Sequence, residues 1–240
     1  MLALLSSHGP KAGALLLILC LSLSAVGEHD EQDNDLVADL SKGATFQFVI
    51  HRDLPAYTFR LAGDSEFKTI DHIEVFRNSE THSVQTLDEC KMEEQPPRRE
   101  KWLKAEDFNF DGYEDLAMLS AWGATGNLSY CIWLFDPVSG QFVYSHNFSD
   151  LGRYQLHPAS KTITTTSVAG MAGAIHVFCT YQVVDNRPLL VEEERQSWDD
   201  EACALLKVIR KRRNGKLVVV TREHVQPDEP WPCQPATTPK

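Results

Sequence analysis

The sequence predicts an all-β protein, because short β-rich segments alternate with polar turns along most of its 240 residues. The turns carry the residues that hairpins require, and the clearest is Asn214-Gly215 between "VIRKRR" and "KLVVV". A helical pattern is found only in "WDDEACALLKV", residues 198–208, where Asp199 or Asp200 would cap a short helix. We therefore expect strands throughout, with this one short helix before the last hairpin.

Four hairpins follow one another along the chain. Each consists of two β-rich runs joined by a polar turn, and the turns lie at 78–80, 136–140, 185–188 and 214–215. Successive antiparallel hairpins must protect their edges, and radial repetition into propeller blades is one way to do so. We expect a propeller-like array of antiparallel hairpins with one calcium loop, and a β-sandwich is the alternative.

Both ends of the chain differ in composition from the β-rich part. Residues 1–27 carry Lys11 and then the apolar run "GALLLILCLSLSAVG", which is typical of a signal peptide. Residues 28–43 are acidic and polar and predict a flexible lead-in. A single all-β domain is expected at 44–225, followed by a proline-rich tail at 226–240. The prediction is a secreted or periplasmic protein without a membrane span.

Charge and cysteine content narrow the classes of partner. The formal net charge is −11, and removal of the signal peptide, which holds one lysine and no acid, makes it one unit more negative. Such a charge argues against nucleic acid and favours a basic partner, or it serves solubility alone. Some cysteines should pair in an oxidising compartment. Cys131 and Cys179 lie in strand-like runs, which suits a bridge between neighbouring strands. Spacing alone leaves the connectivity open for Cys90, Cys131, Cys179, Cys203 and Cys233.

The segment "DFNFDGYEDL", residues 107–116, is the most specific signal in the chain. Oxygen-bearing side chains recur in the pattern D-x-N-x-D-G-x-x-D, and Gly112 permits the sharp turn of such a loop. Carboxylate, amide and carbonyl oxygens suit calcium. The expected ligands are the side chains of Asp107, Asn109, Asp111 and Asp115 and the backbone carbonyl of Tyr113. The alternative is an acidic surface turn. An EF-hand is excluded, because its twelfth position is Met118 and a strand follows.

The loop "DFNFDGYEDL" resembles the calcium loop of FG-GAP and integrin-α-type propeller repeats. Together with "SAWGATGNLSYCIWLFDPVSGQFVYS" and "LGRYQLHPASKTITTTSVAGMAGAIHVFCTYQV", it makes residues 100–222 similar to a family of bacterial periplasmic calcium-binding, propeller-like proteins. At least one branch of that family inhibits lysozyme-like peptidoglycan hydrolases and gives immunity to such toxins. The resemblance thus implies bound Ca2+ and a peptidoglycan hydrolase as the partner.

Lysozyme inhibitors of related periplasmic types present a loop, S-G-x-x-Y in outline, that plugs the catalytic cleft. The nearest match here is "GATGNLSY", with Thr for Ser and one extra residue before the tyrosine. The resemblance therefore implies partner contacts by Gly123, Thr125, Gly126, Asn127, Ser129 and Tyr130. Ser139-Gly140 with Tyr144 is a second candidate, and ordinary turns and a packed tyrosine are the alternative for both. Lysozyme-like enzymes are often cationic, so an acidic inhibitor would be steered towards them.

Catalytic signatures are absent from the sequence. It contains no G-x-S-x-G elbow, H-E-x-x-H, P-loop or G-x-G-x-x-G motif. The acidic runs at 192–194 and 199–201 would alternate between the two faces of a strand, so they indicate solvated edges rather than a glycosidase pair. We predict a binding protein and not an enzyme. The leading function is hydrolase inhibition, the alternative is a non-inhibitory envelope module for another protein or a glycan, and a hydrolase ranks last.

Overall fold

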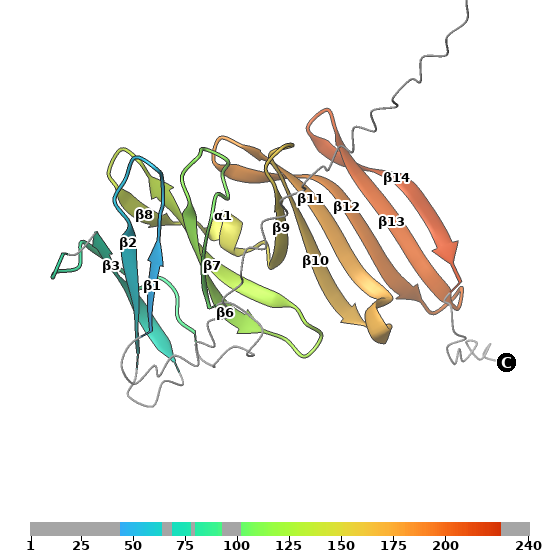
Figure 1. The fold of residues 1–240 in the computed structure, drawn as a ribbon. Helices are drawn as coiled ribbons and strands as arrows, with labels where there is room; N and C mark the ends of the chain where they lie inside the picture. Colours follow the sequence, from blue (N-terminus) through green and yellow to red (C-terminus); the bar gives the residue numbers. More distant parts are fainter. Residues whose placement is uncertain (1–43, 64–68, 78–79, 93–101, 227–240) are drawn as a thin grey trace, which may run out of the picture. The chain divides into compact units, whose positions relative to one another are not determined.

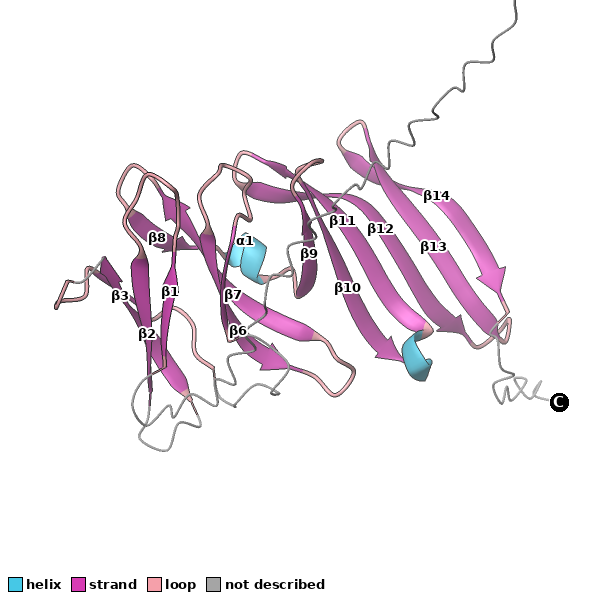
Figure 2. Ribbon diagram, viewed as in Figure 1, coloured by secondary structure: helices cyan, strands magenta, loops and turns pink. Residues whose placement is uncertain are grey.

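The computed structural model describes residues 44–63, 69–77, 80–92 and 102–226. The predicted signal peptide, the lead-in and residues 227–240 of the tail lie outside these ranges. The described residues form fourteen strands, a one-turn helix α1 (His146–Ser149) and a 3-10 turn η2 (Met171–Gly173). The strands form three antiparallel sheets, and helical structure is limited to these two single turns. The all-β prediction is therefore confirmed (Figures 1 and 2). No helix within the described ranges has the length and apolar composition needed to cross a membrane.

The first sheet is a four-stranded meander with the order β1-β2-β3-β4. Its strands alternate inward apolar and outward polar residues, as in "YTFRL", where Tyr57, Phe59 and Leu61 are buried. This period of two places one face on a core and leaves the other towards solvent. The strands are β1 (Thr45–Phe48), β2 (Tyr57–Gly63), β3 (Ile70–Arg77) and β4 (Gln85–Leu87).

The second sheet repeats the meander with the order β5-β6-β7-β8. Its central strands are apolar on both faces, because each face packs against a different core. In β6, Leu116 and Met118 join the core of the first sheet, whereas Ala117 and Leu119 join a second core with Phe108. The strands are β5 (Leu103–Glu106), β6 (Asp115–Trp122), β7 (Leu128–Asp136) and β8 (Gln141–Tyr144). The predicted strand after the acidic loop is confirmed as β6.

The third sheet has six strands in the order β14-β13-β12-β11-β10-β9. Two of its turns were predicted from their residues. Asp185 and Asn186 have φ values of 50° and 56°, and Asn214 and Gly215 have 49° and 78°, the left-handed pair that a tight hairpin requires. The strands are β9 (Arg153–His157), β10 (Thr162–Gly170), β11 (Ile175–Val184), β12 (Arg187–Asp199), β13 (Ala204–Arg213) and β14 (Lys216–Val225).

The helix predicted near residues 198–208 is wrong. β12 continues to Asp199 and β13 begins at Ala204, and these two residues face each other across the sheet. The carboxylate of Asp199 does accept backbone N–H groups, from Glu201 at 3.1 Å and Ala202 at 3.2 Å, but it closes a tight turn. Cross-strand pairing therefore overrides a short local pattern that fits a helix.

The suggested bridge between Cys131 and Cys179 is also wrong. Cys131 of β7 is bonded to Cys90, and Cys179 of β11 is a free thiol. Cys131 faces the first core, next to the segment after β4, whereas Cys179 lies in the third sheet. Cys203 is disulfide-bonded as well. The oxidising compartment inferred from the cysteines agrees with these bonds.

The side chain of Gln85 links the first two sheets through a pair of hydrogen bonds like those between neighbouring strands. The Gln85 amide donates to the carbonyl of Phe142 at 2.6 Å and accepts the N–H of Phe142 at 2.9 Å. β4 of one meander is thereby joined to β8 of the next, and the aromatic rings of Tyr57, Phe59 and Phe142 pack beneath this contact.

Candidate metal centre and adjoining loop

The acidic loop connects β5 to β6 and is anchored by two phenylalanines. Phe108 and Phe110 point into the second core and are 0 % and 9 % exposed. The residues that alternate with them, Asp107 and Asp111, lie towards solvent, while Asn109 is buried. Gly112 has a φ of +94°, as the sharp turn predicted there requires. Alternation of aromatic and oxygen-bearing residues thus separates the anchor of the loop from its ligand side.

Hydrogen bonds wrap the loop around its own carboxylates. Asp107 accepts the N–H groups of Asp111 at 3.1 Å and Gly112 at 2.9 Å. Asp111 accepts the N–H of Tyr113 at 2.9 Å, and the Asn109 amide donates to its other oxygen at 2.8 Å. These hydrogen bonds hold three predicted ligand side chains, those of Asp107, Asn109 and Asp111, in position without a bound ion.

Asp115 ends the loop as a fully buried carboxylate. Its Oδ2 accepts the N–H of Phe108 at 2.9 Å and its Oδ1 accepts the N–H of Phe135 at 2.8 Å. Burial raises the pKa of Asp115 to about 8, because it outweighs the two N–H groups that lower this pKa, and the charges of Asp111 and Asp107 add a smaller upward effect. The ionised form is therefore held in a place where its charge is poorly compensated.

Two neighbouring carboxyl groups show the same excess of negative charge. Burial raises the pKa of Asp107, and the charge of Asp111 adds to that effect against three backbone N–H groups that lower it. Burial also raises the pKa of Glu114, with further contributions from Asp107 and Glu106. A cation beside the loop would lower all of these pKa values at once.

The chemistry of the donor set fits calcium. Asp107, Asn109, Asp111 and Asp115 offer only hard oxygen ligands, the class that Ca2+ prefers. The ring of Tyr113 packs between those of His51, with centroids 4.5 Å apart, and Phe135, at 5.6 Å. These contacts hold Tyr113, whose backbone carbonyl is an expected ligand, in the loop. In the described part of the chain, no three His, Cys, Asp or Glu side chains converge as a metal site by themselves. A bound ion would thus require amide, carbonyl or water oxygens beside the carboxylates.

The predicted partner loop joins β6 to β7 and is largely exposed. Gly123 donates its N–H to the carbonyl of Asn127 at 2.8 Å, and Gly126 has a φ of +80°. The Asn127 side chain donates to the carbonyl of Val168 and accepts its N–H, both at 2.8 Å. The loop, with Thr125 at its exposed tip, is thereby fixed to β10 of the third sheet.

Tyr130 is not exposed, as a residue that plugs the catalytic cleft of a partner would have to be. It occupies an inward position of β7, is 4 % exposed, and packs its ring at 5.0 Å from that of Tyr154 in the second core. The ammonium group of Lys104 lies 5.0 Å from the centre of the Tyr130 ring. The strand period explains this placement, since the flanking Ser129 points outwards. The expectation that Tyr130 is presented to a partner is corrected, whereas Gly123, Thr125, Gly126 and Ser129 are exposed.

The second candidate loop is an ordinary hairpin turn in its geometry. Asp136 accepts the Ser139 hydroxyl at 2.7 Å and the N–H of Val138 at 3.0 Å, while Gly140 has a φ of +67°. Tyr144 packs edge-on against Trp133, with centroids 5.7 Å apart.

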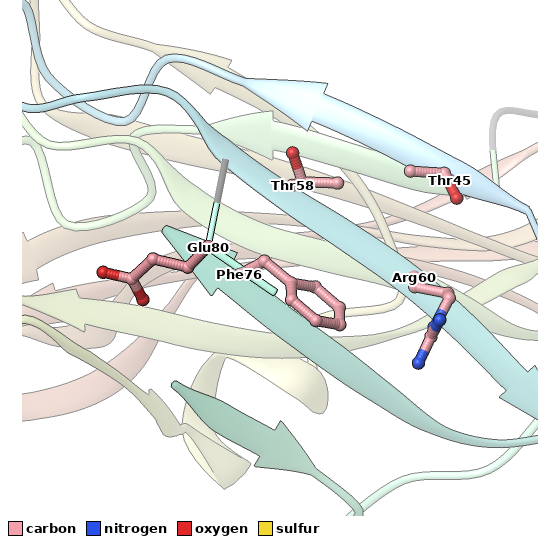
Figure 3. Close-up of a pocket in the computed structure, with 5 residues that line it drawn as sticks. All are labelled: Thr45, Thr58, Arg60, Phe76 and Glu80. Atoms are coloured by element: carbon pink, nitrogen blue, oxygen red, sulfur yellow. The ribbon is translucent and has the colours of Figure 1, made fainter. Parts of the chain in front are cut away.

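A shallow hollow lies on the outer face of the first sheet (Figure 3). The Arg60 guanidinium lies 5.2 Å from the centre of the Phe76 ring and pairs with Glu74. The charge of Arg60 is therefore paired with Glu74, and one face of the Phe76 ring is covered by Arg60. The residues around the hollow are Thr45, Thr58, Arg60, Phe76 and Glu80.

Comparison with known proteins yields a likeness of fold. No protein-family model and no curated protein matches the chain. Among solved structures, the chain is similar to a protein described as a Xanthomonas type IV secretion system related protein. The TM-score is 0.53 and the identity 21 %, over 77 % of this chain and 96 % of that chain. At this level of identity the likeness concerns the fold alone.

Proposed function

We propose that this chain is a secreted or periplasmic, calcium-stabilised binding protein that inhibits a lysozyme-like peptidoglycan hydrolase. The observation that carries the calcium part is the carboxylate of Asp115, which is fully buried beside two further aspartates. A buried carboxyl group of this kind is either protonated or, when ionised, paired or coordinated to a metal. The hard-oxygen donors around it select calcium over a softer ion.

The ion would have a structural role. The Asp115 carboxylate holds Phe108 at one side of the loop and Phe135 of β7 at the other, and these residues belong to different cores. Neutralising the loop would strengthen both attachments at once. Extracellular calcium is abundant enough to keep such a site filled, so permanent occupancy is proposed rather than regulation.

We infer a propeller-like architecture from the two meanders. Each of the first two sheets has four sequential antiparallel strands, which is the form of a propeller blade. The Gln85 bonds to Phe142 provide the contact expected between successive blades. The similar Xanthomonas protein is described as related to a type IV secretion system. This description supports the proposed secreted or periplasmic setting of the present chain.

The partner would be met by the β6–β7 loop. Its tip is exposed, and the Asn127 bonds to Val168 give it the rigidity that an inserted loop needs. Because Tyr130 is buried, contact falls to Gly123, Thr125, Gly126 and Ser129, with Tyr130 anchoring the strand beneath them. The excess of acidic residues favours a cationic enzyme, as peptidoglycan hydrolases often are.

A pull-down tests this proposal. The mature chain, residues 28–240, is immobilised in calcium and exposed to secreted bacterial proteins, and the experiment is repeated with a chelator. Recovery of a peptidoglycan hydrolase in calcium that is lost with chelator supports the proposal. Recovery of no hydrolase by a folded, calcium-loaded bait contradicts the inhibitor role and leaves calcium binding to be tested separately.

A further inference from the structure

The two faces of the third sheet differ in exposure at its middle strands. Thr165, Cys179 and Glu193 stand opposite one another on adjacent strands, and Thr165 and Glu193 are only 8 % and 9 % exposed. Their neighbours along each strand point to the other face. That face carries Phe178, whose side chain is 42 % exposed. An exposed aromatic ring thus stands in the middle of a sheet face.

The strand register surrounds this ring with polar residues. Phe178 of β11 stands opposite Thr166 of β10 on one side and Glu194 of β12 on the other. In the next row on the same face, Thr180 stands between Thr164 and Glu192. Both rows line a shallow hollow of about 270 Å³. It lies over β10, β11 and β12, which are neighbouring strands of the third sheet (Figure 1). The hollow is slightly smaller than a typical small-molecule pocket of roughly 300–1,000 Å³, which suits a ligand group about the size of one six-membered ring.

The Phe178 ring packs against His176 and remains partly exposed to solvent. Its centroid lies 4.4 Å from that of His176, with a tilt of 43° between the planes. Another aromatic ring on an outer sheet face, Phe76, has Arg60 lying over it. No cation–π partner covers Phe178 in the described residues. The ring therefore offers an apolar surface to a ligand without rearrangement.

Charges around the hollow are balanced in pairs. Glu192 pairs with Lys211 at 3.1 Å, and Glu194 pairs with Lys207 at 2.9 Å. Each carboxylate retains lone pairs that can accept hydroxyl groups. The Thr164 hydroxyl is bonded to His157 at 2.9 Å, while the described residues supply no hydrogen-bond partner for the hydroxyls of Thr166 and Thr180. The site presents acceptors and hydroxyl donors but no free net charge.

We propose that this hollow, centred on Phe178, binds an uncharged saccharide. The apolar C–H face of a sugar ring would stack on Phe178, and its hydroxyls would bond to Glu192, Glu194 and Thr180. The balanced ion pairs give no attraction for a polyanion or a cation, which selects a neutral ligand. The site stands on the third sheet and involves neither the calcium ligands nor the β6–β7 loop, so it is independent of the proposed inhibition.

Calorimetric titration tests the proposal with the full mature chain and four short glycans. The neutral probes are cellotriose, chitotriose and maltotriose, and a uronic acid trimer of equal length is the charged comparison. We expect millimolar or tighter binding of at least one neutral trimer and weaker binding of the uronic acid trimer. Phe178→Val keeps a β-favouring residue but removes the ring, and it should weaken that binding about tenfold or more. Thr180→Val should weaken it less.

Phe76→Val is the matched control, because it removes an aromatic ring from another outer sheet face. It should leave saccharide binding unchanged. Equal melting temperatures of Phe178→Val and the wild type exclude loss of fold as the cause. The proposal is overturned if no neutral trimer binds the folded wild type, or if Phe178→Val and Phe76→Val bind the sugar equally well.

Discussion

The Oδ1 atom of Asp115 accepts the backbone N–H of Phe135 at 2.8 Å, so the last ligand position of the acidic loop is tied to the strand β7, 20 residues further on. The other oxygen of the same carboxylate holds Phe108. One buried carboxyl group therefore joins the loop to both cores. This arrangement explains why a residue that costs free energy to bury is placed at the beginning of β6.

Asp111→Ala should abolish the calcium-dependent rise in melting temperature. Asp111 is exposed, so its loss in the metal-free protein removes two hydrogen bonds within the loop, those from the Tyr113 N–H and the Asn109 amide, and should cost only about 1–2 kcal/mol. Differential scanning calorimetry with calcium and with chelator measures both effects. Asp136→Ala, which removes an equivalent turn carboxylate in the β7–β8 hairpin, is the control and should keep the full calcium response. An unchanged calcium response in Asp111→Ala would exclude this loop as the site.

The metal-free protein should lose stability as the pH rises from about 5 to 8. Asp115 has a folded pKa of about 8, above the value of roughly 3.9 of an unfolded chain. Between these values the unfolded state binds fewer protons, so the free energy of unfolding falls as the pH increases. Asp107 and Glu114, whose pKa values are also raised, act in the same direction.

Calcium should reverse this trend, since it binds the ionised loop and competes with protons. Chemical denaturation at pH 5 and pH 8, with calcium and with chelator, checks the prediction. The carboxyl groups with lowered pKa values, Asp136, Asp199 and Glu193, act below this range and do not obscure it. A metal-free protein that is more stable at pH 8 than at pH 5 would contradict the account of Asp115.

Two substitutions of Tyr130 should separate packing from partner contact. Tyr130→Ala leaves a cavity in the second core and should lower the free energy of unfolding by about 3–5 kcal/mol. Tyr130→Phe keeps the ring and should cost only about 1 kcal/mol. Because the ring is buried, Tyr130→Phe should bind a captured hydrolase like the wild type. Loss of that binding at an unchanged melting temperature would mean that the hydroxyl reaches the partner.

Asn127→Ala should detach the partner loop from the third sheet. The substitution removes both bonds to Val168 and should cost about 1–3 kcal/mol. Hydrogen exchange of the Val168 amide should become faster, since this N–H loses its acceptor. Asn127→Asp retains an acceptor for it and should have the smaller effect on exchange. Unchanged protection of Val168 in Asn127→Ala would show that other contacts hold the loop.

Local chemistry made the turns and strands predictable. Gly112, Asn214 and Gly215 adopt the positive φ angles that their residue types favour. The same kind of reasoning gave a wrong helix after Trp198, because a short pattern carries no information about the cross-strand partner Leu205. Secondary structure was therefore predictable where the residue itself sets the backbone, and less so where pairing sets it.

Contacts between distant segments were beyond the sequence. The hydrogen bonds of Gln85 to Phe142 and of Asn127 to Val168 span 57 and 41 residues, and the local sequence pattern does not predict them. The same applies to the burial of Tyr130, since a strand of unknown orientation leaves open which face meets a core. The hollow at Phe178 also arises only from the register of three strands.

The measurement that tests the central claim most directly is inhibition of lysozyme-like peptidoglycan hydrolases in a cell-wall turbidity assay. The account predicts that the mature chain in calcium slows at least one such enzyme. Chelator or Asp111→Ala should relieve the inhibition, as should Thr125→Arg, which places a large cation at the exposed loop tip, while Asp136→Ala should inhibit like the wild type. A folded, calcium-loaded protein that leaves every tested hydrolase fully active would contradict the account.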